Sequence, residues 1–93
     1  MTENELVRSL NSIGKRSFVE DYAIYSDPNL TKEKKVSKLT ELYSLNGATI
    51  RVSYAEKIFL SKKQIDALKI VVNSPRTSAL IRDKAKQLIA KQK

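Results

Sequence analysis

The side chains of this sequence that could perform acid–base chemistry are carboxylates, lysines and tyrosines, because it has no histidine and no cysteine. That composition excludes thiol nucleophiles, disulfides and Cys/His zinc sites. Glu20 and Asp21 are adjacent, so on a helix they point in different directions and cannot act as a pair. The sequence also has no glycine-rich phosphate loop and no nucleophile elbow. We therefore predict a protein that is not an enzyme and has no cofactor, metal or small-molecule substrate.

A different chemistry, the recognition of nucleic acid, is suggested by residues 39–59. They are predicted to form two helices on either side of Asn46-Gly47, a pair that tolerates positive φ in a tight turn. The second helix begins near Thr49 with short polar residues and one arginine, Arg51. Small side chains let a helix approach base edges, and arginine can bond guanine through two hydrogen bonds.

The segment resembles helix-turn-helix DNA-binding domains, and the resemblance rests on that turn and on the residues that follow it. It covers about a quarter of the chain. The resemblance implies a recognition helix whose groove-facing residues are Thr49, Arg51, Ser53, Tyr54 and Lys57. It also implies flanking lysines that hold the phosphates, namely Lys34, Lys35, Lys38, Lys62 and Lys63. The sequence departs from the motif at Leu42 and Tyr43, where a small residue is usual. An ordinary helical hairpin, with Tyr54 as a half-buried ring, is the alternative.

The charge balance points to the same class of partner. Eighteen Lys/Arg against ten Asp/Glu give a net charge of +8, so polyanions are natural ligands. We predict a small nucleic-acid-binding protein, with duplex DNA favoured. The alternative is a non-catalytic accessory module, for example of a phage, plasmid or other mobile element, whose positive face binds an acidic protein. A lysine-rich surface that is merely solvated is also consistent with the composition.

The elements that position these residues are predicted to be helices, because apolar residues recur at helical spacing almost throughout. Thr2 to Glu5 and Ser61 to Gln64 have the form of capping boxes, and Thr31 has the form of an N-cap. The first expected helix ends at Gly14, and the second spans residues 15–26. The third follows Thr31, with Val36, Leu39, Leu42 and Tyr43 facing inward. The remaining three begin near Thr49, after Ser61 and at about residue 77, and the last of them ends at about residue 91. We expect a single all-α domain, 1–93, built as a compact bundle of five to six short helices with a helix-turn-helix-like pair near the middle.

The ends of the chain complete the prediction. The polar, acidic start is no secretory signal, and no apolar run approaches the ~20 residues that span a bilayer, so we expect a cytoplasmic protein without membrane contact. In the last helix, Leu80, Ile81, Leu88 and Ile89 either close the core or pack on a second subunit, which leaves a homodimer open. The basic residues near the C-terminus lie on several sides of that helix, which suits phosphate contact or solvation better than a membrane surface: Arg76, Arg82, Lys84, Lys86, Lys91 and Lys93.

Overall fold

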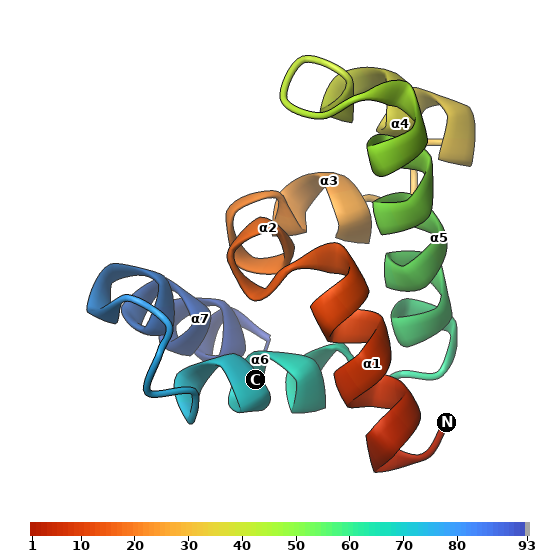
Figure 1. Ribbon diagram of the computed structural model, residues 1–93. Coiled ribbons are helices and arrows are strands. Elements are labelled where there is room, and N and C mark those ends of the chain that lie inside the picture. The colour runs from red at the N-terminus through yellow and green to blue at the C-terminus, as the bar shows by residue number, and fades with distance from the viewer. Residues whose placement is uncertain (93) are drawn as a thin grey trace.

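The protein, seen in a computed structural model that describes residues 1–92, is all-α, as predicted, with seven helices and no strand in that range. The helices are α1 (Glu3–Ile13), α2 (Lys15–Glu20), α3 (Tyr22–Ser26), α4 (Lys32–Leu39), α5 (Leu45–Leu60), α6 (Gln64–Val72) and α7 (Ala79–Lys91). Helix α1 packs along α5, while α6, which also contacts α1, forms a hairpin with α7 at the lower left of the molecule (Figure 1). Among the described residues, no helix has the length and apolar character needed to cross a membrane.

The core forms where these helices meet. Its largest fully buried side chains include Leu10 of α1, Phe18 of α2, Ile58 of α5 and Leu68 of α6. Phe18 also lies at the centre of an aromatic cluster, whose other members are Tyr22, Tyr25 and Phe59. The burial of these side chains is the main stabilising contribution in a chain of this size.

Several predicted helix boundaries are confirmed. The hydroxyl oxygen of Thr2 accepts from the backbone N–H of Glu5 at 3.2 Å, and that of Thr31 accepts from Lys34 at 3.3 Å. Gly14 ends α1 with φ 91°, a conformation that glycine adopts without strain. Local capping chemistry therefore determines where α1 and α4 begin.

Two other predictions of helical structure were wrong. Residues 15–26 form two short helices that meet at Asp21, whose carboxylate accepts a hydrogen bond from Ser17 inside the fold. The segment from Ser61 to Gln64 is not a capping box. Instead Lys62 takes φ 56°, and the N–H of Lys63 bonds to the carbonyl of Ile58, so α5 ends in a Schellman motif with lysine where glycine is usual.

The apolar faces of the last helix and of α4 are narrower than predicted. Ile81 is buried, but Leu80, the residue before it on α7, is 79% exposed. Leu42 was expected to face inward and is 68% exposed, because α4 ends at Leu39 and Leu42 belongs to the connection that follows. Tyr43 is half-buried.

Candidate nucleic-acid interface

The central helix, α5, starts earlier than the sequence suggests. Ser44 is its N-cap, and the Ser44 hydroxyl accepts from the backbone N–H of Gly47 at 3.1 Å. Asn46 and Gly47 therefore lie in the first helical turn, and the prediction that they form a tight turn was wrong. The true connection between α4 and α5 runs from Thr40 to Ser44 and contains no glycine. A serine cap two residues earlier outweighs the turn preference of Asn-Gly.

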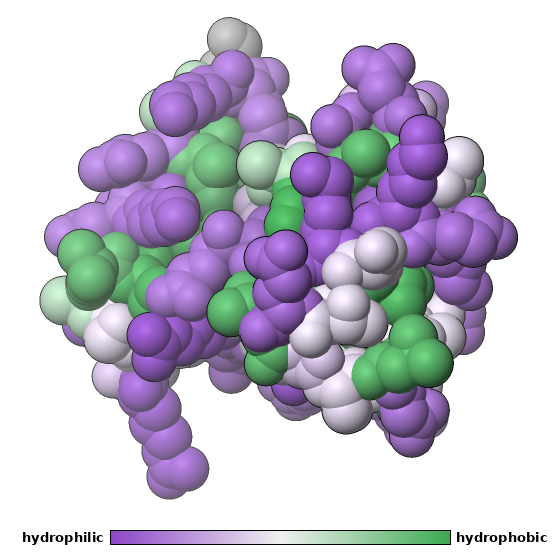
Figure 2. All heavy atoms as spheres, turned by 90° about the horizontal axis from the view of Figure 1, so that it is seen from above, coloured by the Kyte–Doolittle hydropathy of each residue, from purple (hydrophilic) through white to green (hydrophobic). Residues whose placement is uncertain are grey.

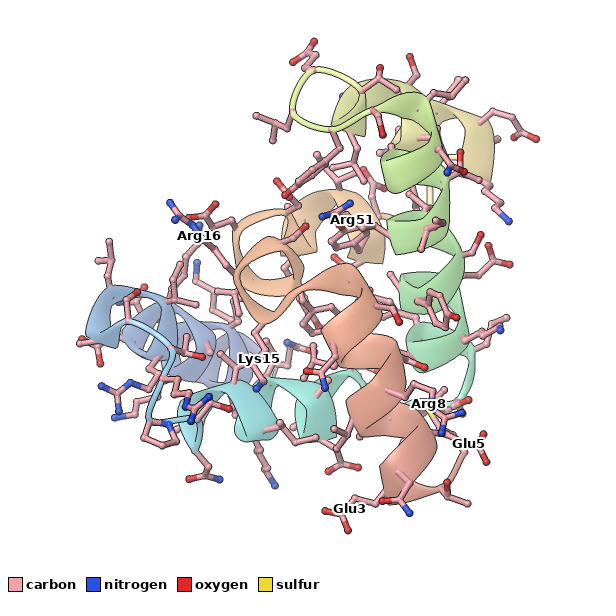
Figure 3. The ribbon with its side chains drawn as sticks, in the orientation of Figure 1. Glu3, Glu5, Arg8, Lys15, Arg16 and Arg51 are labelled. Carbon is pink, nitrogen blue, oxygen red and sulfur yellow. The ribbon has the colours of Figure 1, made fainter. Side chains whose placement is uncertain are left out.

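Arg51 does not point freely into solvent. Its guanidinium carbon lies 4.0 Å from the centroid of the Tyr43 ring, and Nη1 donates to the carbonyl of Gly47 at 3.2 Å. Figure 3 shows the side chain reaching from α5 toward α2 and α3. This arrangement is typical of a structural cation–π contact. The guanidinium is therefore engaged within the fold, and this conformation does not present it for a bidentate contact to guanine.

The tyrosine on which Arg51 lies belongs to a polar network beneath it. The hydroxyl of Tyr43 donates to Oδ2 of Asp21 at 3.2 Å, and the same oxygen accepts from Ser17 at 3.1 Å. Ser17 Oγ and the hydroxyl of Tyr25 are 2.8 Å apart. Burial raises the pKa of Tyr25 to about 12 and also raises the pKa of Tyr22. Every member of this network has a partner inside the protein, which indicates a structural role.

Three of the predicted groove-facing residues do share one surface. Thr49, Ser53 and Lys57 are spaced by four along α5, so they lie on one face of the helix, away from its buried side. The Thr49 hydroxyl donates to the carbonyl of Leu45 at 2.8 Å. Lys57 lies 5.1 Å from the Tyr54 ring centroid, and Tyr54 itself is half-buried against the core. This face therefore offers one lysine and two small hydroxyl groups.

The flanking lysines do not form one surface. Lys34 and Lys38 are exposed on α4, whereas Lys35 donates to the carbonyl of Tyr25 at 2.9 Å. Lys62 and Lys63 lie beyond the far end of α5, which has 16 residues and is about 24 Å long. Lys63 also pairs with Asp66 at 3.6 Å. The two lysine groups therefore lie near opposite ends of α5.

The largest total excess of positive charge lies elsewhere, in the basic hairpin, by which we mean residues 62–91 with helices α6 and α7. Residues 62–93 contain nine Lys/Arg and two Asp/Glu, a net charge of +7, whereas residues 1–61 contain nine and eight, a net charge of +1. Exposed basic side chains of the hairpin are Lys62, Lys69, Arg76, Lys84, Lys86 and Lys91. Counting acidic residues along the chain would have identified this segment from the sequence.

Little within the hairpin neutralises this charge. Among residues 1–92, ion pairs join only Arg16 to Glu20 and Lys63 to Asp66. On α7, Lys84 and Lys91 are seven residues apart, so they lie on the same side of the helix. Lys86 lies on the other side, and the buried residues Ile81 and Ala85 lie between the two sides. Lys15, at the start of α2, points down toward α6 in Figure 3, and α2 packs against α7. The hairpin thus presents cations on both flanks of α7.

Within residues 1–92, no three His, Cys, Asp or Glu side chains are grouped so that they could hold a metal ion. The arrangement is suited to electrostatic contact with an extended anion. Comparisons with models of protein families, with curated proteins and with solved structures found no match to this chain.

Proposed function

We propose that this protein is a non-catalytic nucleic-acid-binding module that holds the phosphates of duplex DNA on its basic hairpin. The observation that carries the proposal is the uneven charge, +7 in residues 62–93 against +1 in residues 1–61. Duplex DNA has one negative charge per about 1.7 Å of its axis, so a surface rich in exposed lysines releases counterions when it binds. Long lysine and arginine side chains can follow such a backbone without close fit.

The proposal gives phosphate contacts priority over base contacts. Arg51 is held by Tyr43 and Gly47, so α5 keeps Thr49, Ser53 and Lys57 as the polar groups of its exposed face. Threonine and serine hydroxyls contact bases or phosphates without strong selectivity between base pairs. Binding is therefore expected to depend weakly on DNA sequence, with α5 in a secondary role.

The direct test is a titration of a short mixed-sequence DNA duplex at salt concentrations from about 50 to about 200 mM. We expect log K to fall linearly with log salt concentration, with a slope of about −0.9 for each phosphate contact. A second duplex of unrelated sequence should bind with similar affinity. No binding at low salt, or an affinity that barely changes across this range, would contradict the proposal.

A further inference from the structure

Helix α7 lies at the edge of the molecule, where it packs against α6 and α2 (Figure 1). Its inward side is formed by the buried residues Ile81 and Ala85, with Leu88 and Ile89 partly buried beside them. Seen from above, in Figure 2, long hydrophilic side chains protrude at the left, which is the side on which α7 lies in Figure 1. The outward side of this helix is therefore open to a partner.

The centre of the outward side is a stripe of four exposed residues, which we call the α7 stripe: Ala79, Asp83, Gln87 and Ala90. They follow one another at intervals of four, four and three residues, so they lie on one face of the helix. Two of the four are alanines, and none is a lysine or an arginine. Another surface can therefore approach the helix backbone closely along this stripe.

Basic residues line the α7 stripe on both sides. Lys84 and Lys91 lie on one flank, and Arg82 and Lys86, four residues apart, lie on the other. At about 100° per residue, the two pairs are on nearly opposite sides of the helix, with the stripe between them. Arg82 is half-buried, and its Nε has no hydrogen-bond partner among the described residues. The positive charge of α7 is thus arranged as two rows, which we call the basic rows.

This arrangement resembles the charge pattern of a DNA groove, where phosphates line both edges and the base edges form the floor. The major groove is about 12 Å wide and admits an α-helix, whose diameter with side chains is about 10–12 Å. The minor groove, at about 6 Å, is too narrow for one. The geometry of α7 is therefore complementary to the major groove.

The two polar residues of the α7 stripe fit the floor of that groove. Asp83 takes part in neither of the two ion pairs that join described residues, and phosphates would repel its carboxylate. In the major groove, however, a carboxylate can accept a hydrogen bond from N4 of cytosine. Gln87, one turn further along, has the amide that can bond adenine. These side chains therefore suit base edges, while the basic rows suit phosphates.

From these observations we infer that α7 lies in the major groove of the bound duplex. The α7 stripe faces the base edges, and the two basic rows hold the phosphates of opposite strands. This inference rests on the proposed function, because it takes duplex DNA as the partner. Two polar side chains favour some registers on a mixed-sequence duplex over others without selecting a single site, so a weak dependence on sequence is still expected.

The test titrates the full chain with three duplexes that carry the same phosphates. The first is unmodified. The second contains glucosylated 5-hydroxymethylcytosine, whose uncharged sugar fills the major groove, and the third has inosine in place of guanine, which removes only the N2 amino group in the minor groove. We expect at least about tenfold weaker binding of the glucosylated duplex and a change of less than about twofold with inosine.

Two matched variants test whether α7 is the helix in the groove. Ala90→Trp adds bulk within the α7 stripe, and Ala23→Trp adds the same bulk at an exposed alanine of α3. Ala90→Trp should weaken binding of the unmodified duplex at least about tenfold, whereas Ala23→Trp should leave it unchanged. Both alanines are exposed, so we expect both variants to remain folded, and thermal melts check this.

The outcomes separate this inference from the proposed function. Equal affinity for the unmodified and glucosylated duplexes, with salt-dependent binding intact, would overturn the inference and leave the proposed function standing, since the phosphates would then be held from outside the groove. A larger loss with inosine than with the glucosylated duplex would place the protein in the minor groove and overturn it too. Equal effects of the two tryptophans would remove α7 from the groove. No binding of the unmodified duplex at low salt would contradict the proposed function itself.

Discussion

Arg51 shows how one side chain can have the right chemistry for DNA and still serve the fold. Its guanidinium, which could bond guanine through two N–H groups, instead donates one hydrogen bond from Nη1 to the carbonyl of Gly47 and lies over the ring of Tyr43. Tyr43 in turn donates to Asp21, so Arg51 fixes the α4–α5 connection against α2 and α3. Lys57, six residues along the helix, is exposed, and its ammonium group lies 5.1 Å from the centroid of the Tyr54 ring.

The exchange Arg51→Ala should therefore act on stability rather than on recognition. We expect a loss of about 1–2 kcal/mol in the free energy of unfolding, because a cation–π contact and a backbone hydrogen bond disappear. DNA affinity should fall no more than in Lys57→Ala, which removes the same charge. Urea denaturation and duplex titration measure both quantities. Unchanged stability with a much larger loss of DNA affinity in Arg51→Ala than in Lys57→Ala would instead identify Arg51 as a base-reading residue.

The buried phenol of Tyr25 makes stability depend on alkaline pH. Its pKa is raised to about 12 from an ordinary value of 10, so the unfolded chain loses this proton more readily than the folded one. The stability that Tyr25 contributes is present below pH 10 and is lost as pH rises toward 12. Urea denaturation of the wild type between about pH 8 and about pH 11 should show this decline, and Tyr25→Phe should flatten it. Identical pH profiles for the two proteins would contradict this account.

At the scale of elements, the start of α5 decides how the middle of the chain is organised. Asn-Gly is a strong turn signal, yet here it follows a serine that caps the helix. Only Gly14 among the two glycines has a positive φ. A Cβ at Gly47 would lie 3.0 Å from Arg51 Nη1 and 3.1 Å from Ser44 Oγ. Both atoms belong to side chains, so an alanine can be accommodated if these side chains shift slightly.

The pair Gly47→Ala and Gly14→Ala tests that arrangement. Alanine at 47 gains about 1 kcal/mol of helix propensity, which the crowding of Arg51 and Ser44 offsets, so stability should change by less than about 1 kcal/mol. Alanine at 14 must adopt a left-handed conformation and should cost about 1–2 kcal/mol. Denaturant midpoints give both values. A large loss at 47 equal to that at 14 would mean that Asn46-Gly47 is a turn after all.

The sequence predicts what is local and misses what depends on distant neighbours. Helical periodicity and the caps at Thr2, Gly14 and Thr31 define the all-α class and several boundaries. The direction of Arg51 depends on Tyr43, eight residues away, and that of Tyr43 depends on Asp21. Periodicity alone does not reveal such contacts.

The predicted boundary between α5 and the next helix is wrong for a related reason. Helix α5 ends in a Schellman motif in which Lys62 occupies the position where glycine is usual. Because no glycine marks this end, the sequence predicts instead that Ser61 begins the next helix. The helix-turn-helix resemblance at residues 39–59 and the surplus of basic over acidic residues after position 61 point to two different surfaces of the molecule.

At the scale of the whole molecule, the positive charge is distributed unevenly, with a net charge of +7 in residues 62–93 and +1 in residues 1–61. The basic hairpin lies at the lower left of Figure 1, and α4 with the start of α5 lies at the upper right. The molecule measures 31 × 26 × 24 Å, and the basic hairpin forms one end of it.

The most direct test of the central claim compares two triple variants that remove equal charge. Lys84→Gln/Lys86→Gln/Lys91→Gln changes the basic hairpin, and Lys34→Gln/Lys38→Gln/Lys57→Gln changes the surface that the helix-turn-helix resemblance implies. For each, the salt dependence of binding to one DNA duplex is measured beside the wild type. We predict that the hairpin variant flattens the slope by about 2 to 3, at about 0.9 per lost phosphate contact, and that the other variant leaves the slope nearly unchanged. Equal changes in both variants, or the larger change in the second, would contradict the account.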